Sequence, residues 1–416
     1  MGSKPGLDTT RSLLSEMGDP QEDLKYIHVG GTNGKGSVSL IIANILTKAG
    51  YKVGRYTSPH LTSYCERFTV DNEPVTPEEL KNYLDLTEKC IQKMLAKGLP
   101  HPTEFEVLTA VAFQFFRDKG VDFAVLEVGM GGIFDSTNVI IPLVSVITSV
   151  SFDHTQYLGE TIEEIAFNKA GIIKTGVPVV TGLMDERAIA VIRAEAEIKN
   201  SPLLVSQSVK VEQVRSQGLH GQTVRFNGAM NTEEELEFSL AGMYQLENLA
   251  TALTALSVLK DEFNISRAAL RDGLCSLTLN GRMQVLNENP LVIADVAHNA
   301  EGARALACSL KTLLPRQSNV MVIGIVDDKD AHSILALLGG LTKACIITRP
   351  EGERSSKWEK AADVFRNLFP DIFILVEADI HQAMDKGLDL LDESDYLLVT
   401  GSFYVLKKAC QFQFNN

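Results

Sequence analysis

The sequence predicts an α/β protein made of two units, each with a mostly parallel β-sheet covered by helices. Continuous apolar runs at 122–130 (DFAVLEVGM) and 142–150 (PLVSVITSV) are typical of strands that are buried on both faces. Such runs alternate with helical patterns through the first 200 residues or so, and the alternation begins again after residue 290. This βαβ rhythm predicts helices packed on parallel sheets.

The elements of the first unit follow from apolar runs and helix-start signals. Strands are expected at 26–31, 51–57, 122–130, 142–150 and 177–183, and a helix at 37–49 that ends at Gly50. Three further helices begin with a capping box, in which a Thr is followed three residues later by a Glu. The boxes are Thr76 with Glu79, Thr103 with Glu106, and Thr161 with Glu164, and Pro77 suits the first helical position.

The pattern changes between residues 203 and 240, where short alternating runs such as 209–214 (VKVEQV) and 222–226 (QTVRF) predict a small antiparallel addition. A helix is expected over about 243–262. Five strand candidates then follow, at 291–299, 319–328, 344–350, 371–379 and 396–403. We therefore expect two domains, 1–285 and 286–416, the second of ordinary domain size.

Composition limits the classes of function. The net charge is 39 − 53 = −14, which repels nucleic acid and anionic membranes. No apolar run reaches the roughly 18 residues of a membrane span, and the N-terminus has no secretory signal. The 6 cysteines are scattered without a CxxC pair, which indicates reduced thiols and a cytoplasmic protein. We expect a monomer, because no assembly element stands out.

A glycine-rich segment, 28–38 (HVGGTNGKGSV), follows the first strand and opens the first long helix. Glycines there allow backbone N–H groups to converge on phosphate oxygens, and the helix N-terminus adds positive potential. Lys35 can supply a cation to the terminal phosphates, and Ser37 a hydroxyl to Mg²⁺. The segment predicts an N-terminal P-loop mononucleotide-binding domain. The alternative is an ordinary glycine-rich turn between strand and helix.

Polar side chains also follow two of the apolar strands. Glu127 ends one strand and His154 follows the next, so with Ser37 they offer three ligands where ligands bind to open α/β sheets. Lys169 lies in a largely apolar segment, 162–174. A buried lysine tends to be neutral, and a neutral amine can react with CO₂ to give an anionic carbamate. The alternatives are a structural His154 and a salt-bridged or solvated Lys169.

The chain resembles the folylpolyglutamate synthases and dihydrofolate synthases, ATP-dependent amide ligases related to the Mur ligases. The resemblance includes the glycine between Lys35 and Ser37 and extends over most of the chain. The motifs, in order, are 56–61 (YTSPHL), 66–68 (ERF), 126–138 (LEVGMGGIFDSTN), 151–159 (SFDHTQYLG), 165–174 (IAFNKAGIIK), 280–284 (NGRMQ), 295–299 (DVAHN) and 399–404 (VTGSFY). It implies a smaller C-terminal Rossmann-like glutamate-ligase domain.

The resemblance also implies a reaction and its residues. A carboxylate of dihydropteroate or a folate would attack ATP, and the acyl phosphate would form an amide with L-glutamate. Nucleotide contacts are expected at Thr32, Asn33, Gly34, Lys35, Gly36, Ser37, Asn248, Arg282 and Asp295. Two Mg²⁺ ions, with K⁺ as a further candidate cation, are expected on Ser37, Glu127, His154 and carbamylated Lys169. Catalytic roles are expected for Lys35, Lys169, Arg282 and His298, and substrate contacts for Ser58, His60, Arg67, Phe105, Asp135 and Ser402.

Some residues have other interpretations. Asp295 taken alone suits an N-cap of the following helix, and Phe105 suits core packing. The sequence departs from the family at Ile133, where many relatives have Arg, and at Asn168, where Glu is usual. The chain also starts late, so most of the family's first helix is expected to be missing.

Four other functional classes fit the sequence less well. A P-loop phosphotransferase would not need the second α/β unit. Another Mur-type amino-acid ligase would need a UDP-binding domain before the phosphate loop, for which the preceding segment is too short. A dinucleotide oxidoreductase is disfavoured because Phe134 interrupts the GxGxxG pattern. A catalytically inactive binding protein is disfavoured because the reactive residues are all present.

Overall fold

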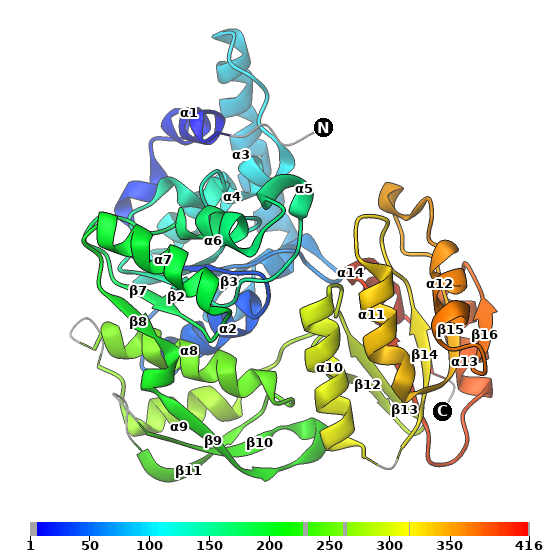
Figure 1. The fold of residues 1–416 in the computed structure, drawn as a ribbon. Helices are drawn as coiled ribbons and strands as arrows, with labels where there is room; N and C mark the ends of the chain where they lie inside the picture. The colour runs from blue at the N-terminus through cyan, green and yellow to red at the C-terminus, as the bar shows by residue number, and fades with distance from the viewer. Residues whose placement is uncertain (1–5, 228–231, 261–263, 316, 415–416) are drawn as a thin grey trace.

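The computed structural model describes residues 6–227, 232–260, 264–315 and 317–414, and it has two parts that lie side by side (Figure 1). The N-terminal part holds an eight-stranded sheet and a three-stranded sheet, and the C-terminal part holds a six-stranded sheet. The α/β fold predicted from the sequence is confirmed.

The eight-stranded sheet has the order β4-β3-β2-β5-β1-β6-β7-β8. Its strands are β1 (Tyr26–Gly30), β2 (Val53–Tyr56), β3 (Phe68–Val70), β4 (Glu73–Pro74), β5 (Phe123–Glu127), β6 (Val144–Ile147), β7 (Val179–Thr181) and β8 (Leu203–Val205). All neighbours pair in parallel except β2 with β3 and β3 with β4. The expectation that residue 203 begins the antiparallel addition is wrong, because β8 returns from a helix and joins β7 in parallel.

Helices cover both faces of this sheet. One face carries α2 (Lys35–Lys48), α8 (Tyr244–Val258) and α9 (Arg267–Cys275). The other carries α1 (Asp8–Glu16), α3 (Pro77–Ala96) and α4 (Glu104–Lys119) over one half, and α6 (Ile162–Ala170) and α7 (Glu186–Ile198) over the other. The short α5 (Thr155–Leu158) precedes α6. All three predicted capping boxes are confirmed, at the starts of α3, α4 and α6.

The three-stranded sheet confirms the antiparallel addition. It consists of β9 (Lys210–Ser216), β10 (Gln222–Asn227) and β11 (Thr232–Phe238), with β10 in the middle. Phe226 and Phe238 pack into the core formed with α2 and α8. The helix expected at about 243–262 is α8, which ends at Val258, and part of the expected end lies outside the described residues.

The six-stranded sheet has the order β12-β13-β17-β14-β15-β16. Its strands are β12 (Gln284–Glu288), β13 (Leu291–Asp295), β14 (Asn319–Ile323), β15 (Thr342–Ile347), β16 (Phe373–Val376) and β17 (Tyr396–Thr400), all parallel except β12. One face packs on α10 (Ala300–Leu313), α11 (Ala331–Leu338) and α12 (Lys360–Leu368), and the other on α13 (Ile380–Asp389) and α14 (Phe403–Ala409). Helix α10 lies along the boundary with the N-terminal part (Figure 1).

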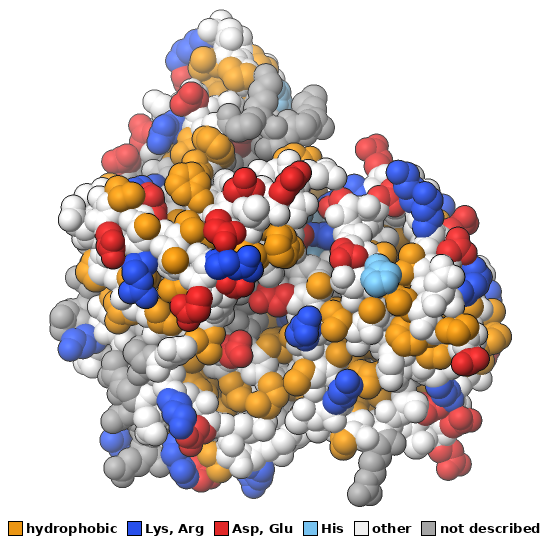
Figure 2. Space-filling model, viewed as in Figure 1, with side chains coloured by type: hydrophobic (Ala, Val, Ile, Leu, Met, Phe, Trp, Pro, Cys, Tyr) orange, Lys and Arg blue, Asp and Glu red, His pale blue; other side chains and the backbone are white. Residues whose placement is uncertain are grey.

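The surface has mixed charge. Figure 2 shows acidic and basic side chains scattered over both parts on this face, without one large basic patch. Among the described residues, no helix is long and apolar enough to cross a membrane.

Candidate functional site

The phosphate loop connects β1 to α2 and needs glycine at two positions for steric reasons. Gly31 has φ 143° and Gly34 has φ 83°. A Cβ atom on residue 31 would lie 2.0 Å from Thr148 Oγ1, and one on residue 34 would lie 2.3 Å from Asn248 Oδ1. Thr148, which the sequence did not single out, also donates a hydrogen bond to Asn33 O at 2.6 Å. The loop is therefore held in shape by β6 and α8.

Lys35 begins α2 and folds back over the loop. Its Nζ donates hydrogen bonds to Gly31 O and Thr32 O, both at 3.1 Å. Burial lowers the pKa of Lys35, while the charges of Glu127 and Asp153 oppose this shift. The lysine thus lies at the mouth of the loop, next to two carboxylates.

Ser37 and Glu127 lie at the same end of the sheet, and both are buried. A Cβ on Gly36 would lie 3.7 Å from Glu127 Oε2, so the carboxylate is close to the start of α2. Glu127 also accepts a hydrogen bond from Ser58 N at 3.3 Å. Burial raises its pKa, while the charge of Lys35 opposes the increase. A hydroxyl and a carboxylate are oxygen donors of the kind that Mg²⁺ prefers.

Lys169 and His154 lie across the loop from Ser37. Lys169 is 3% exposed, and burial lowers its pKa to about 7. Its Nζ makes no hydrogen bond or ion pair with any residue in the described part of the chain, so Lys169 is not salt-bridged there. Burial lowers the pKa of His154 to about 4, which leaves a neutral imidazole at neutral pH. Both residues share a hollow of about 110 Å³ with Lys35, Glu127 and Asp153.

No three His, Cys, Asp or Glu side chains are gathered as a metal site among the described residues. The donors around the loop are instead one hydroxyl, one carboxylate, one imidazole and one buried amine. A cation held there would depend on oxygens from phosphate or a carbamate in addition to the side chains.

Asp153 connects this site to the C-terminal part, and sequence reasoning missed it. It forms an ion pair with Lys329, and its Oδ2 lies 3.5 Å from His298 Nε2. Burial alone would raise the pKa of Asp153, but His298 and Lys329 lower it overall. Asp153 is adjacent to His154 in a quoted motif, so it could have been found. No sequence pattern around Lys329 indicates that it pairs with Asp153.

A hollow of about 130 Å³ follows between α8 and the C-terminal part. Asn248, Arg282, Asp295 and His298 line it together with Asn33 and Ser37. The first four come from three chain segments, which the fold brings to the same side of the loop.

Asp295 is not the N-cap of the following helix, so that interpretation is wrong. Asn299 caps α10 by accepting a hydrogen bond from Gly302 N at 2.8 Å. Asp295 instead accepts hydrogen bonds from Met283 N and Ala297 N, both at 2.9 Å. Asp295 lies too far before α10 to cap it. Its hydrogen bond with Met283 N instead joins the segment that precedes β12 to the end of β13.

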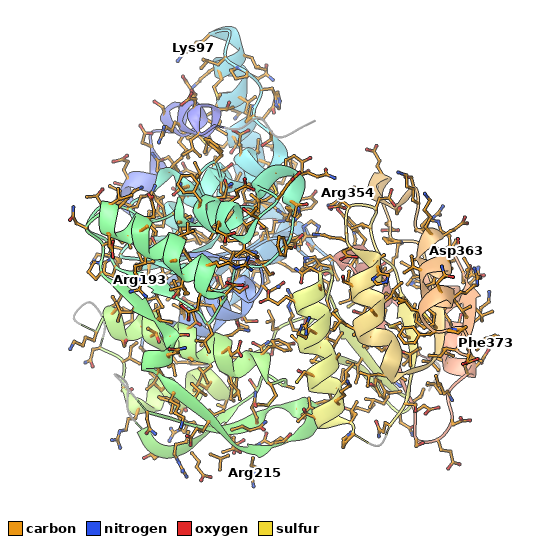
Figure 3. The ribbon with its side chains drawn as sticks, in the orientation of Figure 1. Lys97, Arg193, Arg215, Arg354, Asp363 and Phe373 are labelled. Carbon is orange, nitrogen blue, oxygen red and sulfur yellow. The ribbon has the colours of Figure 1, made fainter. Side chains whose placement is uncertain are left out.

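The loop after β2 faces a larger hollow of about 700 Å³. Arg67 Nε donates a hydrogen bond to His60 Nδ1 at 3.0 Å. Ser402, the N-cap of α14, lines the opposite side together with Lys329 and Arg354. Arg354 lies at the edge of the C-terminal part that faces the N-terminal part (Figure 3). Ser58 lies between this hollow and the phosphate loop. The hollow is rich in cations and suits a substrate with carboxylates.

Phe105 and Asp135 are not among the residues that line these hollows. The Phe105 ring stacks on Tyr56 with centroids 6.0 Å apart, which is the core-packing role. Asp135 accepts hydrogen bonds from Met130 N at 2.9 Å and Thr137 N at 3.0 Å. Both carboxylate oxygens are thereby used to fix the loop after β5.

Of the two departures from the family pattern, Ile133 lies beside α6 and Asn168 lies within it. A Cβ on Gly171 would lie 2.2 Å from Ile133 Cγ1, so Ile133 packs closely against the end of α6. Asn168 Nδ2 donates a hydrogen bond to Leu158 O at 2.8 Å. The two residues brace the helix that carries Lys169.

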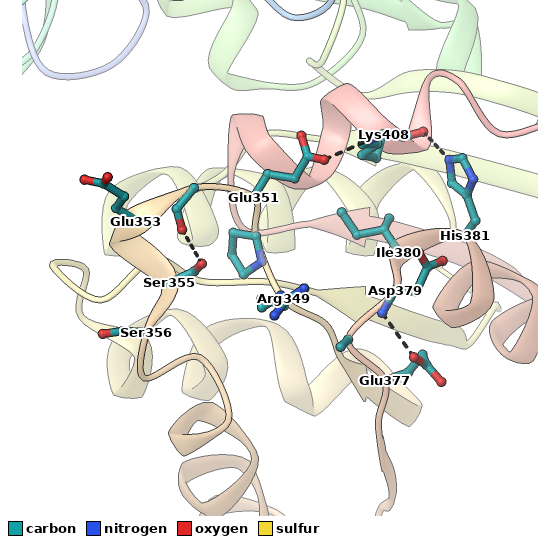
Figure 4. Close-up of a pocket in the computed structure, with 13 residues that line it drawn as sticks. Arg349, Glu351, Glu353, Ser355, Ser356, Glu377, Asp379, Ile380, His381 and Lys408 are labelled. Atoms are coloured by element: carbon teal, nitrogen blue, oxygen red, sulfur yellow. Dashed lines mark hydrogen bonds and ion pairs between the residues drawn. The ribbon is translucent and has the colours of Figure 1, made fainter.

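A wider hollow of about 800 Å³ lies beyond β15 and β16, within the C-terminal part (Figure 4). Lys408 Nζ lies 3.2 Å from Glu351 Oε1, and the backbone carbonyl of Lys408 contacts His381 Nε2 at 3.1 Å. Glu377 pairs with Lys386. Because these charges are matched to one another, the candidate site is the group of hollows around the phosphate loop.

Known proteins match this chain over most of its length. Two family models match the chain, the Mur ligase middle domain over 29–256 and the Mur ligase, glutamate ligase domain over 281–403. Dihydrofolate synthase/folylpolyglutamate synthase of Bacillus subtilis (strain 168) is 37% identical over 412 residues, which are 97% of this chain and 94% of the relative.

Two solved structures are similar over nearly the full length. Mycobacterium tuberculosis folylpolyglutamate synthase complexed with ADP and AMPPCP has a TM-score of 0.92 and 31% identity, covering 98% of this chain and 95% of its own. An FPGS–AMPPCP–folate complex has a TM-score of 0.84 and 34% identity, covering 99% of this chain and 96% of its own.

Proposed function

Because the chain belongs to the Mur ligase family, and within it to the folylpolyglutamate and dihydrofolate synthases, we propose that it is an ATP-dependent ligase that joins L-glutamate to a folate. Dihydropteroate is a second proposed acceptor. The observation that carries this proposal is the shared hollow around the phosphate loop, where Lys35, Glu127, His154 and Lys169 meet.

ATP is proposed to lie along the loop, with its phosphates at the N-terminus of α2. The glycine backbone and Lys35 would hold the phosphates. The nucleoside would enter the neighbouring hollow lined by Asn248, Arg282 and Asp295. A phosphate loop and a nucleoside hollow in direct contact are what a bound nucleotide requires.

The donor set around the loop suits Mg²⁺. Ser37 and Glu127 would hold one ion, and His154 with carbamylated Lys169 a second, while K⁺ is a further proposed cation. Bound Mg²⁺ would neutralise charge on the phosphate oxygens. Lys169 fits a carbamate because it is buried and has no counterion. Its amine would form an N–C bond to CO₂ and release a proton to solvent.

The reaction would proceed in two steps. An acceptor carboxylate oxygen attacks the γ-phosphorus of ATP, the bond to ADP breaks, and an acyl phosphate forms. The amine of L-glutamate then attacks the acyl carbon, and inorganic phosphate leaves with the bonding electrons while the amine loses a proton. Lys35 and the loop N–H groups would stabilise charge in the first step. Arg282 and His298, which line the hollow around the loop, would contact the acyl phosphate.

The hollow of about 700 Å³ would hold the acceptor and glutamate. Ser58, His60 and Arg67 would face the acceptor from the N-terminal part, and Ser402 would face glutamate. Closing the two parts would exclude water, which otherwise hydrolyses an acyl phosphate. Phe105 and Asp135 remain proposed contacts to the pterin, although both are packed into the protein.

Measuring ADP release tests the proposal. We expect release to require both L-glutamate and an acceptor, and comparison of dihydropteroate with tetrahydrofolate would define the acceptor. ADP release that needs an acceptor but not glutamate would instead support a phosphotransferase. We also propose a cytoplasmic monomer that binds no nucleic acid, with domains 1–285 and 286–416. Sedimentation velocity would test the monomer.

A further inference from the structure

Arg55 on β2 has a half-buried side chain without a partner among the described residues. Its Nε is shielded from solvent and has no hydrogen-bond partner. Within the described ranges, the side chain makes no hydrogen bond or ion pair at all. Burial lowers its pKa to about 10, which leaves the group charged at neutral pH. An unpaired buried charge is costly, so such a group indicates a missing anion.

A second unsatisfied group lies opposite. Thr69 on β3 is paired with Arg55 in the register of the sheet, and its Oγ1 is also buried without a partner. Both residues line a hollow of about 220 Å³. Two donors that face one space and lack acceptors make the hollow suited to a ligand that only accepts hydrogen bonds.

Neither acid around this hollow forms an ion pair with Arg55 in the described structure. Glu66 lines it, but its oxygens accept hydrogen bonds from Leu61 N and Thr62 N, both at 2.8 Å, and from Ser63 N at 2.7 Å. Glu127 is the other acid, and its charge partly offsets the lowering of the Arg55 pKa, but it lies against the loop near Gly36 and accepts no hydrogen bond from Arg55.

The Arg55 hollow adjoins the proposed reaction site. Ser37 lines it. It also shares six lining residues with the hollow that contains Lys35 and Lys169, namely Gly36, Ser58, Pro59, Glu127, Arg282 and Phe403. A second guanidinium, that of Arg282, therefore faces the same space. A group released at the phosphate loop could pass directly toward Arg55.

We propose that Arg55 and Thr69 form an oxyanion site that receives inorganic phosphate after the amide bond forms. The proposal rests on the proposed function, which supplies phosphate as a product. A guanidinium offers paired N–H donors that match two phosphate oxygens, and the Thr69 hydroxyl can donate to another. Phosphate would satisfy both unpartnered groups at once. An acceptor carboxylate shares this oxyanion chemistry, so the experiment separates the two.

The test measures binding without turnover. Inorganic phosphate is titrated calorimetrically into the protein with Mg²⁺ and ADP, for the wild type and the Arg55→Met variant. We expect phosphate to bind the variant at least about tenfold more weakly, the scale of losing a charge-assisted hydrogen bond, while ADP affinity changes less than about twofold. Arg55→Lys should recover part of the phosphate affinity.

Arg215→Met is the matched control. Arg215 is also on a strand, but it is exposed, pairs with Glu237 at 3.5 Å and lies at the outer edge of the three-stranded sheet (Figure 3). This variant should bind phosphate as the wild type does. Phosphate should raise the melting temperature of the wild type and the control, but not that of Arg55→Met.

Folding is checked in phosphate-free buffer, where Arg55→Met should melt no lower than the wild type because it removes an unpaired buried charge. A lower melting temperature would mean a structural role and overturn the proposal. Unchanged phosphate affinity in Arg55→Met would also overturn it, as would no phosphate binding to the wild type. Weakened binding of the acceptor alone would assign the site to a carboxylate instead.

Failure of the proposed function is seen separately. Absence of glutamate-dependent ADP release in the wild type would refute the ligase, whereas calorimetry reports the phosphate site directly.

Discussion

The side-chain amides of Asn33 and Asn299 exchange two hydrogen bonds. Asn33 Nδ2 lies 3.2 Å from Asn299 Oδ1, and Asn299 Nδ2 lies 3.0 Å from Asn33 Oδ1. Asn299 Nδ2 also donates to Asp153 Oδ2 at 3.1 Å. Glu301 extends the contact by accepting a hydrogen bond from Ser151 Oγ at 2.8 Å. The C-terminal part thus forms hydrogen bonds with both the phosphate loop and the turn after β6.

Asn299→Ala should lower kcat for glutamate-dependent ADP release about tenfold, because it removes both amide–amide hydrogen bonds to Asn33 and leaves Asn33 Nδ2 with Glu301 alone. Steady-state kinetics would measure this. Asn287→Ala is the control, since Asn287 is half-buried on β12, away from the phosphate loop, and its side chain bonds locally to Pro290 O at 2.8 Å. Equal rates for the two variants would show that the contact does not position the loop.

Lys35→Ala should reduce the rate by at least about two orders of magnitude, the scale of losing one charge-stabilising donor. The reason is that Lys35 is the cation folded over the loop carbonyls. Lys48→Ala, at the other end of α2, should leave the rate nearly unchanged. Near-normal turnover of Lys35→Ala would refute the role given to this lysine.

Gly34→Ala should abolish measurable ATP binding, because the new Cβ would lie 2.3 Å from Asn248 Oδ1 and the backbone has φ 83°. Gly98→Ala is the control that has backbone strain without a steric clash. Gly98 has φ 76°, but a Cβ added there would have no atom within 4 Å. Both should lose about 1 kcal/mol of stability from backbone strain. Calorimetric titration of ATP would distinguish them, and intact binding by Gly34→Ala would contradict the model of the loop.

Lys169 should carry one added CO₂ in intact-mass spectra recorded with bicarbonate under non-denaturing conditions. Lys169→Arg should lack the adduct and lose activity, because a guanidinium does not form the carbamate. Lys174 provides the comparison, since its Nζ already donates a hydrogen bond to Asn138 O at 2.9 Å. An unmodified Lys169 in an active sample would remove the carbamate from the mechanism.

Stability should depend on Glu79 in acid. Its hydrogen bond with Lys119 and the capping box at Thr76 lower its pKa from 4.5 to about 2. The contribution is therefore complete above about pH 4.5 and is lost as pH falls toward 2. Glu79→Gln should flatten urea-unfolding stability across this window. Glu78→Gln, at the exposed neighbouring position, should leave the pH dependence of the unfolding free energy unchanged. If the free energy of unfolding changed with pH in the same way in the wild type and in Glu79→Gln, the titration of Glu79 would not contribute to acid stability.

Local signals in the sequence predict much of the fold. The runs that became β5 and β6 are buried along their whole length, so their apolar character is continuous. The capping boxes depend only on residues three apart and could be identified directly. Strand β12 was missed because it is a partly exposed edge strand without an apolar run. The LLV of β8 is too short to indicate which sheet it joins.

The candidate site was predicted where its residues belong to motifs and missed where they pair over distance. Glu127, His154 and Lys169 follow from strand ends and burial. Lys329 is 176 residues from Asp153, so only the fold relates them. Arg55 could not be identified for a different reason. A single charged residue within a strand does not indicate a binding site until the structure shows that it has no partner.

The segment between the two parts is held at both ends, and on the N-terminal side Leu277 N donates a hydrogen bond to Ser239 Oγ at 2.9 Å. Asp295 holds Met283, and Gly281 O accepts a hydrogen bond from Val296 N at 3.0 Å, so residues 281–283 belong mechanically to β13. The pivot for any swing of the C-terminal part must then come before Gly281. Arg282 lies on the C-terminal side of that pivot, so it would move together with the C-terminal part. The angle between the two parts would therefore set the distance between the Arg282 guanidinium and the proposed nucleotide.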